Sequence, residues 1–250
     1  MKAYETVIHH VETGILDGSL RVGTHLLPER DLAAELGVSR SAVREAIRAL
    51  EAQGVVTSAV GAGKDAGTRI TDMRSAALSR LLKLHVALAK YPVDEVVEAR
   101  VALERSSVAL AARRLDDAGR DRLRALLDRM ADPAVHQDEF NALDTEFHVV
   151  LAESGHNRLV TDMTVAVRES LRRPILDAER SLADWESFRS SLQEHHEAIY
   201  HAVSAGDGER AAELVEQHIR ATYTILPITL GEITFATGQP GTAGVSPVRR

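Results

Sequence analysis

The chain has 250 residues, of which 44% are hydrophobic and 27% are charged, and this balance is that of a soluble globular protein. It contains no cysteine, which excludes a disulfide framework and a thiolate metal site. The formal net charge is −7, so a nucleic-acid binder of this composition must gather its positive charge locally. The N-terminus lacks the apolar run of a signal peptide, and no segment approaches ~20 uninterrupted apolar residues. We therefore expect a cytoplasmic protein with no membrane partner.

The first third of the chain combines three helices with a short hairpin. Apolar residues recur at helical spacing over residues 4–17, 29–36 and 40–53. Two β-prone pieces follow at 55–57 and 68–71. The glycine-rich connection between these pieces predicts a β-hairpin with a long, flexible tip.

The junction between the second and third helices has the features of a helix-turn-helix motif. Gly37 can adopt the left-handed conformation that ends a helix. Val38 would then fill the turn, and Ser39 is a good N-cap for the next helix. In a helix-turn-helix motif, the helix after the turn is the one that enters a major groove.

The outward face of that third helix predicts contact with double-stranded DNA. It carries three arginines at four-residue spacing, Arg40, Arg44 and Arg48. Ser39 and Ser41 place hydroxyl groups near the helix N-terminus, where backbone N–H groups also favour phosphate. Glu45 is the only acid between Ser39 and Arg48, so the face is the positive patch that DNA binding requires. A merely solvated helix face is the alternative, which the turn and the hairpin make less favoured.

From about residue 75 the sequence is helical. Seven helices are expected, at residues 75–90, 93–114, 117–131, 137–154, 157–182, 185–205 and 208–228. Pro174 should kink or split the fifth of them, because proline lacks the backbone N–H. The fold class is therefore mainly α, with a winged helix-turn-helix domain at 1–74 and an all-helical bundle of six or seven helices at 75–230. Residues 231–250 are rich in Gly, Pro, Thr and Ser and predict a disordered tail.

Four polar residues fall on or beside the apolar faces of these bundle helices. Asp144 lies on the stripe of its helix, with His148 at the edge one turn later. His196 and His218 lie on consecutive helices at similar distances from the connection at 205–208, so an antiparallel hairpin places them at one level. A buried carboxylate is costly unless it is paired or bound to a cation. The set predicts a divalent metal, Zn²⁺ or Ni²⁺, although each histidine alone could be an ordinary core residue.

The stretch "ERDLAAELGVSRSAVREAIRALEAQGVV" resembles the winged-helix head of the GntR transcriptional regulators. By this resemblance, five residues contact DNA bases or phosphates: Arg30, Ser39, Arg40, Ser41 and Arg44. Two features depart from the family pattern. Pro28 stands one place later than the usual Leu-Pro, and the wing tip is the longer "GAGKDAGT", whose only basic residue, Lys64, is a further candidate for DNA contact.

Three further stretches resemble the all-helical ligand-binding domain of the FadR-type GntR subfamily, called the FCD domain, over roughly residues 78–225. They are "EARVALERSSVALAARRL", "LDTEFHVVLAESGHNRLV" and "HEAIYHAVSAGDGERAAELVEQHI". The family's metal is held by a D-x-x-x-H motif and two later histidines, which implies the ligand set Asp144, His148, His196 and His218. Arg100 resembles a family arginine that faces the effector cavity. It would clamp a small carboxylate bidentately, or else pair with Glu104 one turn later.

These observations predict a metabolite-responsive transcription regulator, a repressor, that binds a divalent metal and a small carboxylate effector. We expect a homodimer on a palindromic operator, and no enzymatic activity. Two alternatives stay open. The same four side chains could form the site of a metal-dependent enzyme, or the helical domain could serve only as a dimerisation scaffold.

Overall fold

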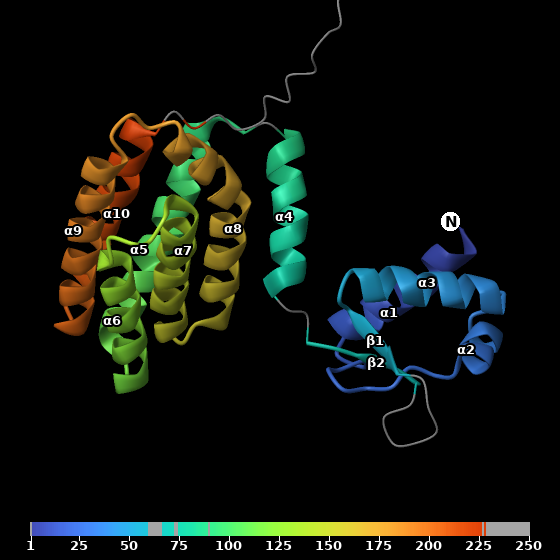
Figure 1. The fold of residues 1–250 in the computed structure, drawn as a ribbon. Coiled ribbons are helices and arrows are strands. Elements are labelled where there is room, and N and C mark those ends of the chain that lie inside the picture. The colour runs from blue at the N-terminus through green and yellow to red at the C-terminus, as the bar shows by residue number, and fades with distance from the viewer. Residues whose placement is uncertain (1, 60–66, 73–74, 90, 227, 229–250) are drawn as a thin grey trace, which may run out of the picture.

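The N-terminal part of the protein is a three-helix unit with a β-hairpin (Figure 1). A computed structural model describes residues 2–59, 67–72, 75–89, 91–226 and 228. The elements of this part are α1 (Ala3–Leu16), α2 (Glu29–Glu35), α3 (Arg40–Ala52), β1 (Val56–Ala59) and β2 (Gly67–Ile70). The two strands are antiparallel, with Val56 opposite Ile70. They begin and end within two residues of the predicted pieces; most of the predicted tip, Lys64 included, lies outside the described residues.

The turn between α2 and α3 has the predicted conformation. Gly37 has a φ of +65°, in the left-handed region, and the backbone N–H of Val38 donates to the carbonyl of Ala33 at 3.0 Å. Ser39 caps α3, since its hydroxyl accepts a hydrogen bond from the backbone N–H of Ala42 at 3.2 Å. The helix-turn-helix prediction is therefore confirmed at the level of single hydrogen bonds.

A separate hydrophobic core holds this part together. Its fully buried side chains come from every helix and from both strands: Val7, Val11, Leu32, Val43, Ala46, Leu50, Val56 and Ile70 are among them. Because α3 turns this apolar face inward, its arginine face is left on the outside.

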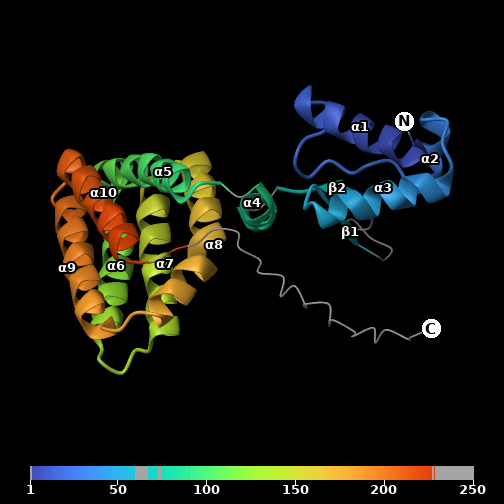
Figure 2. The ribbon, with the colours of Figure 1, turned by 90° about the horizontal axis from the view of Figure 1, so that it is seen from above.

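Seven helices make up the rest of the described chain, as predicted (Figures 1 and 2). They are α4 (Ser75–Ala89), α5 (Val93–Arg114), α6 (Asp117–Ala131), α7 (Gln137–Ser154), α8 (Arg158–Arg180), α9 (Trp185–Ser204) and α10 (Gly208–Ile225). Pro174 lies inside α8 and does not split it. None of the described helices is long and apolar enough to cross a membrane.

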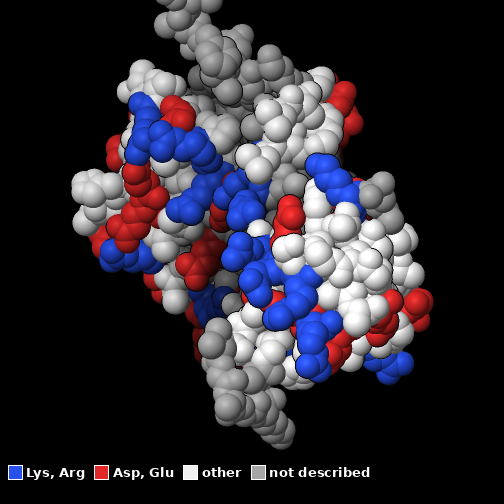
Figure 3. All heavy atoms as spheres, turned by 90° about the vertical axis from the view of Figure 1, so that its right-hand side faces the viewer, with Lys and Arg blue, Asp and Glu red and all other residues white. Residues whose placement is uncertain are grey.

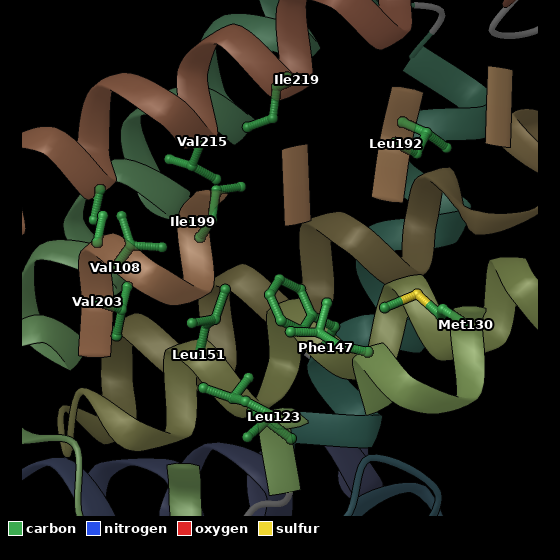
Figure 4. Close-up of a cluster of buried hydrophobic side chains, with 14 of the residues drawn as sticks. Val108, Leu123, Met130, Phe147, Leu151, Leu192, Ile199, Val203, Val215 and Ile219 are labelled. Atoms are coloured by element: carbon green, nitrogen blue, oxygen red, sulfur yellow. The ribbon is translucent and has the colours of Figure 1, made fainter. Parts of the chain in front are cut away.

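Helix α5 packs against four others, α7, α8, α9 and α10, and so forms the centre of the bundle. The core around it is aliphatic, with Phe140 and Phe147 as its largest buried side chains (Figure 4). Helices α9 and α10 pack together and are joined by a tight turn in which Gly206 has a φ of +79°. Any polar side chain on the inner face of α5, α7, α8, α9 or α10 is therefore placed inside the molecule.

Helix α4 differs from the other six helices of this part. It packs chiefly on α8, at the side of the bundle that faces the N-terminal part (Figures 1 and 2). It also provides the covalent connection between β2 and the bundle.

Candidate DNA-binding surface and metal centre

The predicted arginine face of α3 is exposed, but one of its members is already paired. Arg44 donates from Nη2 to Oε2 of Glu29, at 2.8 Å, and from Nε to Oε1 at 3.3 Å. Hydrogen bonding to Arg44 holds the pKa of Glu29 below its usual value, so the pair is ionised at neutral pH. Counting acids along α3 alone missed Glu29, because it comes from α2.

The other predicted contact residues that the structure describes are also exposed. Arg40 and Arg48 are exposed, and neither has an acidic partner at ion-pair distance in the part of the chain that the structure describes. Arg30, at the start of α2, pairs with Asp31 at 2.9 Å, and the hydroxyl oxygens of Ser39 and Ser41 lie 2.9 Å apart. Viewed from the side of this N-terminal part, Lys and Arg gather in a band across the molecule (Figure 3).

Inside the bundle, the four predicted metal ligands come together. Asp144 and His148 of α7, His196 of α9 and His218 of α10 each offer one ligand atom, and these atoms all lie within 4.8 Å of one another. The ring centroids of His196 and His218 are 4.7 Å apart, as the equal-level argument predicts. Four ligand atoms at about 2.1 Å from one tetrahedral ion lie roughly 3.4 Å from one another. The ligand atoms therefore need to close by up to about 1.4 Å, which side-chain rotation can supply.

The hydrogen bonding of the histidines fits a cation. All three rings are at most 2% exposed. Nε2 of His148, Nδ1 of His218 and Nδ1 of His196 have no hydrogen-bond partner among the described residues. Nε2 of His196 lies 3.0 Å from Oδ1 of Asp144, which is itself one of the four candidate ligands. Burial lowers the pKa of His148, helped by the charge of Arg168, to about 4, and burial likewise holds that of His218 well below its usual value. The rings of His148 and His218 are therefore neutral at pH 7, which is the form that binds a metal.

A charged network that the sequence analysis did not identify surrounds these ligands. Glu104 of α5 lies 2.7 Å from Nδ1 of His148 and accepts hydrogen bonds from Arg168 of α8 at 2.6 and 2.8 Å. Arg168 also donates to Asp144 at 2.7 Å. By holding the proton on Nδ1, Glu104 leaves the Nε2 lone pair of His148 facing the other ligands. Both residues lie on apolar stripes, so the criterion that singled out Asp144 would also have found them.

Arg100 adopts one of its two predicted roles. Its Nε donates to Oε1 of Glu104 at 2.6 Å, and its Nη1 lies 3.5 Å from the hydroxyl of Tyr223. Burial alone would raise the pKa of Glu104, but Arg168 and Arg100 outweigh it and hold that pKa well below the usual value. The same balance, with Arg168 as the main counter-charge, keeps Asp144 ionised. The positive charges of the two arginines therefore neutralise the negative charges of the two carboxylates.

A further buried acid, Glu179 of α8, belongs to no ion pair in the described chain. It is 3% exposed, and its partner is Asn141, which donates to it at 3.2 Å from the turn of α7 that precedes Asp144. Burial, with the charge of Asp144, raises the pKa of Glu179 to about 8, so the side chain is largely protonated at neutral pH. Sequence reasoning missed it, although Ile175 and Leu182, at i−4 and i+3, place it on an apolar stripe of the helix predicted at residues 157–182.

Comparison with known proteins identifies the two parts of the chain. Residues 3–64 match the family described as "Bacterial regulatory proteins, gntR family", and residues 95–221 match the "FCD domain". The chain belongs to the GntR family. GntR proteins are DNA-binding transcription regulators, and this one, with its FCD domain, is a regulator and not an enzyme.

Several GntR-family relatives cover nearly the whole chain. HTH-type transcriptional regulator LutR of Bacillus subtilis (strain 168) is 30% identical over 213 residues, 85% of this chain and 95% of LutR. A protein of Escherichia coli (strain K12) named for regulation of the L-lactate dehydrogenase operon is 27% identical over 89% of this chain and 85% of its own. Among solved structures, Streptococcus agalactiae GntR has the same fold, with a TM-score of 0.56 at 23% identity, over 89% of this chain and all (100%) of that one.

Proposed function

We propose that this GntR-family regulator, of the FadR branch, is a repressor that senses a small carboxylate through a metal ion in its helical domain. The observation that carries the proposal is the convergence of Asp144, His148, His196 and His218. Each of the three histidines has a buried ring nitrogen with no partner outside this set among the described residues. These four residues would hold Zn²⁺ or Ni²⁺, which would supply positive charge and free coordination positions for carboxylate oxygens.

Charge balance supports an anionic effector. The four ionised groups around the ligands, Asp144, Glu104, Arg100 and Arg168, already sum to zero. A divalent cation therefore brings an uncompensated +2 into a buried site, and an anion would offset it. A carboxylate fits the oxygen-binding preference of these metals, and one relative is named for the L-lactate dehydrogenase operon. Arg100 would help to bind the effector if it turned from Glu104.

The protein would bind DNA as a homodimer, with one DNA-binding head from each chain. We assign residues 1–74 to the head and 75–230 to the helical domain, and two chains would pair through their helical domains. The two heads would then meet successive major grooves of a palindromic operator, in the cytoplasm where that operator lies. Contacts are assigned to Arg30, Ser39, Arg40, Ser41, Arg44, Arg48 and Lys64. Effector binding would shift the arrangement of the heads and so change operator affinity.

Elemental analysis and an operator-release assay test the sensing proposal. The purified protein should hold about one divalent ion per chain, and the double variant His148→Ala, His196→Ala should hold little. A panel of small carboxylates, added to the complex with an operator selected from random DNA, should release the DNA from the metal-loaded protein only. Full metal content in the double variant would refute the site. Tighter DNA binding on carboxylate addition would instead indicate activation, as in the relative named Glc operon transcriptional activator.

The alternative of a passive scaffold predicts a different outcome. A helical domain that only dimerises would show neither metal content nor a change in melting temperature with any carboxylate. Operator binding would persist in that case, because it depends on the head alone.

Arg44→Ala tests the DNA-binding surface separately. Loss of a base or phosphate contact should lower specific DNA affinity by about 1–3 kcal/mol. The variant should keep its metal content and its oligomeric state, because Arg44 lies on the outside of α3. Glu29→Gln is the matched control, since it frees Arg44 without removing it. DNA affinity equal to wild type in Arg44→Ala would contradict the assignment.

A further inference from the structure

The ion pair between Glu29 and Arg44 leaves part of the Arg44 guanidinium group unused. Glu29 binds one side of this group, because its two carboxylate oxygens accept from Nε at 3.3 Å and from Nη2 at 2.8 Å. In this side-on arrangement, Nη1 and the second N–H of Nη2 remain available at the outer end of the side chain. Nη1 has no hydrogen-bond partner among the residues that the structure describes. Arg44 therefore keeps a fork of two parallel N–H donors at its tip, although its charge is already paired.

The packing of two helices sets the position of this pair. Glu29 is the first residue of α2, and Arg44 lies on α3. The two helices pack together, and Leu32 of α2 and Val43 of α3 are both buried in the core of the head. The backbone positions of Glu29 and Arg44 are therefore fixed relative to each other in the free protein. Both side chains remain accessible to DNA, since they are 32% and 53% exposed.

Arg44 differs in this respect from the two other arginines on the outer face of α3. Arg40 and Arg48 have no acidic partner at ion-pair distance in the described part of the chain, so each presents a full positive charge, which attracts phosphate. The pair of Glu29 and Arg44 has no net charge, so its attraction to a phosphate is weak. Its free N–H fork is nevertheless intact. The complement of such a fork is a neutral group with two acceptors side by side.

We propose that Glu29 is a positioning residue, which orients Arg44 so that it selects guanine in the operator. In the major groove, guanine presents N7 and O6 as adjacent acceptors, and a bidentate arginine is the commonest specific contact to them. Arg44 is the fifth residue of α3, in the N-terminal half of the helix that contacts base edges. This inference rests on the proposed DNA-contacting face of α3. It adds which base Arg44 reads and which residue directs it there.

Selection from random DNA locates the base that Arg44 contacts. The wild type and Arg44→Ala each select operators from a pool of random-sequence duplexes. The half-site position where only the wild type selects guanine is the Arg44 position. Affinities for duplexes with each of the four bases at that position give the guanine preference, which should be roughly 10-fold or more for the wild type. A selection in which Arg44→Ala loses no guanine would overturn the proposal.

Glu29→Gln then tests the orienting role. The freed Arg44 can turn to a phosphate, so the guanine preference should fall below about 3-fold. Affinity for a random-sequence duplex should rise, and the plot of log affinity against log salt should steepen by about one for each head. Helical content and melting temperature should match those of the wild type, because an exposed ion pair contributes little to stability.

Two matched controls separate orientation from net charge. Glu45→Gln removes an exposed acid of the same helix that forms no ion pair in the described chain, so the guanine preference should be unchanged. Arg48→Ala removes an unpaired arginine of the same face. It should make the salt dependence shallower by about one for each head and leave the guanine preference intact.

The double variant shows whether Glu29 acts through Arg44. In the Arg44→Ala background, Glu29→Gln should no longer change the preference for any base. A wild-type guanine preference in Glu29→Gln, or an equal loss in Glu45→Gln, would overturn the role of Glu29 and leave Arg44 as a DNA contact. Operator affinity equal to wild type in Arg44→Ala would instead overturn the DNA-binding face on which the inference rests.

Discussion

At the residue scale, the centre of the helical domain holds two buried arginines and two carboxylates whose charges neutralise one another. Glu104 is the residue that joins the parts, because it contacts Arg100, Arg168 and His148 at once. A buried ion pair adds little stability relative to well-packed apolar residues, but removing one partner leaves an uncompensated charge. We therefore expect the network to hold the ligands in position. Its loss should lower both the free energy of unfolding and the affinity for metal.

Glu104→Gln should test this role. We expect the free energy of unfolding of the metal-free protein to fall by ~3–5 kcal/mol, because two buried arginines lose their shared counter-charge. Metal affinity should fall about 10–100-fold, since the orientation of His148 is no longer held. Urea denaturation and metal titration give the two values. Glu98→Gln, at an exposed position of the same helix, should change neither, and an unaltered Glu104→Gln variant would show that the network is dispensable.

Glu179 gives the metal-free protein a specific pH dependence. The pKa of its carboxyl group is raised to about 8 in the folded protein, so folding favours the protonated form. The stability that this group contributes is fully present below the unfolded pKa of about 4.3 and is lost as pH rises to about 8. Glu179→Gln should therefore gain stability relative to the wild type between pH 5 and pH 8, by up to ~1.4 kcal/mol per pH unit.

Denaturation of the wild type and Glu179→Gln at several pH values measures this difference. The histidines cancel from the comparison because both proteins contain them. A constant difference over the whole range would show that Glu179 is ionised in the folded protein. Glu194→Gln, at an exposed position of α9, is the control and should give no slope.

At the element scale, the head depends on how one helix ends and the next begins. Gly37 has a positive φ, and a Cβ added there would meet no atom within 4 Å. The cost of a substitution is therefore confined to the backbone conformation. Gly37→Ala should destabilise the protein by ~1–2 kcal/mol, whereas Gly37→Asn should be milder because asparagine tolerates this region. Thermal unfolding of the two variants makes the comparison, and equal losses would point to a contact in place of backbone strain.

In the bundle, the candidate metal site depends on how whole helices pack together. Asp144 and His148 share one face of α7, while His196 and His218 depend on the packing of α9 on α10. A ligand set spread over three helices forms only when all three are docked. Metal binding and folding of the bundle should therefore be coupled.

At the scale of the whole molecule, that coupling is measurable. A metal at 100 times its dissociation constant should raise the free energy of unfolding by ~2.7 kcal/mol, and a carboxylate effector should add to this only in the metal-loaded protein. Differential scanning calorimetry with Zn²⁺, Ni²⁺ and a chelator gives the comparison. A shift equally large in His148→Ala, His196→Ala would place the metal elsewhere.

Local patterns in the sequence were sufficient for much of this protein. Helical periodicity predicted all the helices, Gly37 and Ser39 predicted the turn, and the positions of Asp144, His148, His196 and His218 predicted their convergence. These features depend on neighbours a few residues apart, or on one hairpin whose length can be counted. The same criterion of charge on an apolar stripe applies to Glu104 on α5 and to Arg168 on α8.

Only the tertiary structure decided the pairing of charges that come from distant elements. Glu29 of α2 forms an ion pair with Arg44 of α3, and Arg100 forms one with Glu104. Glu179 of α8 is buried and accepts a hydrogen bond from Asn141 of α7. Which face of α4 packs on α8 and which stays exposed could not be predicted either, because both faces are apolar. Sequence periodicity identifies an apolar face, but the element that covers it is set by how all the helices pack together.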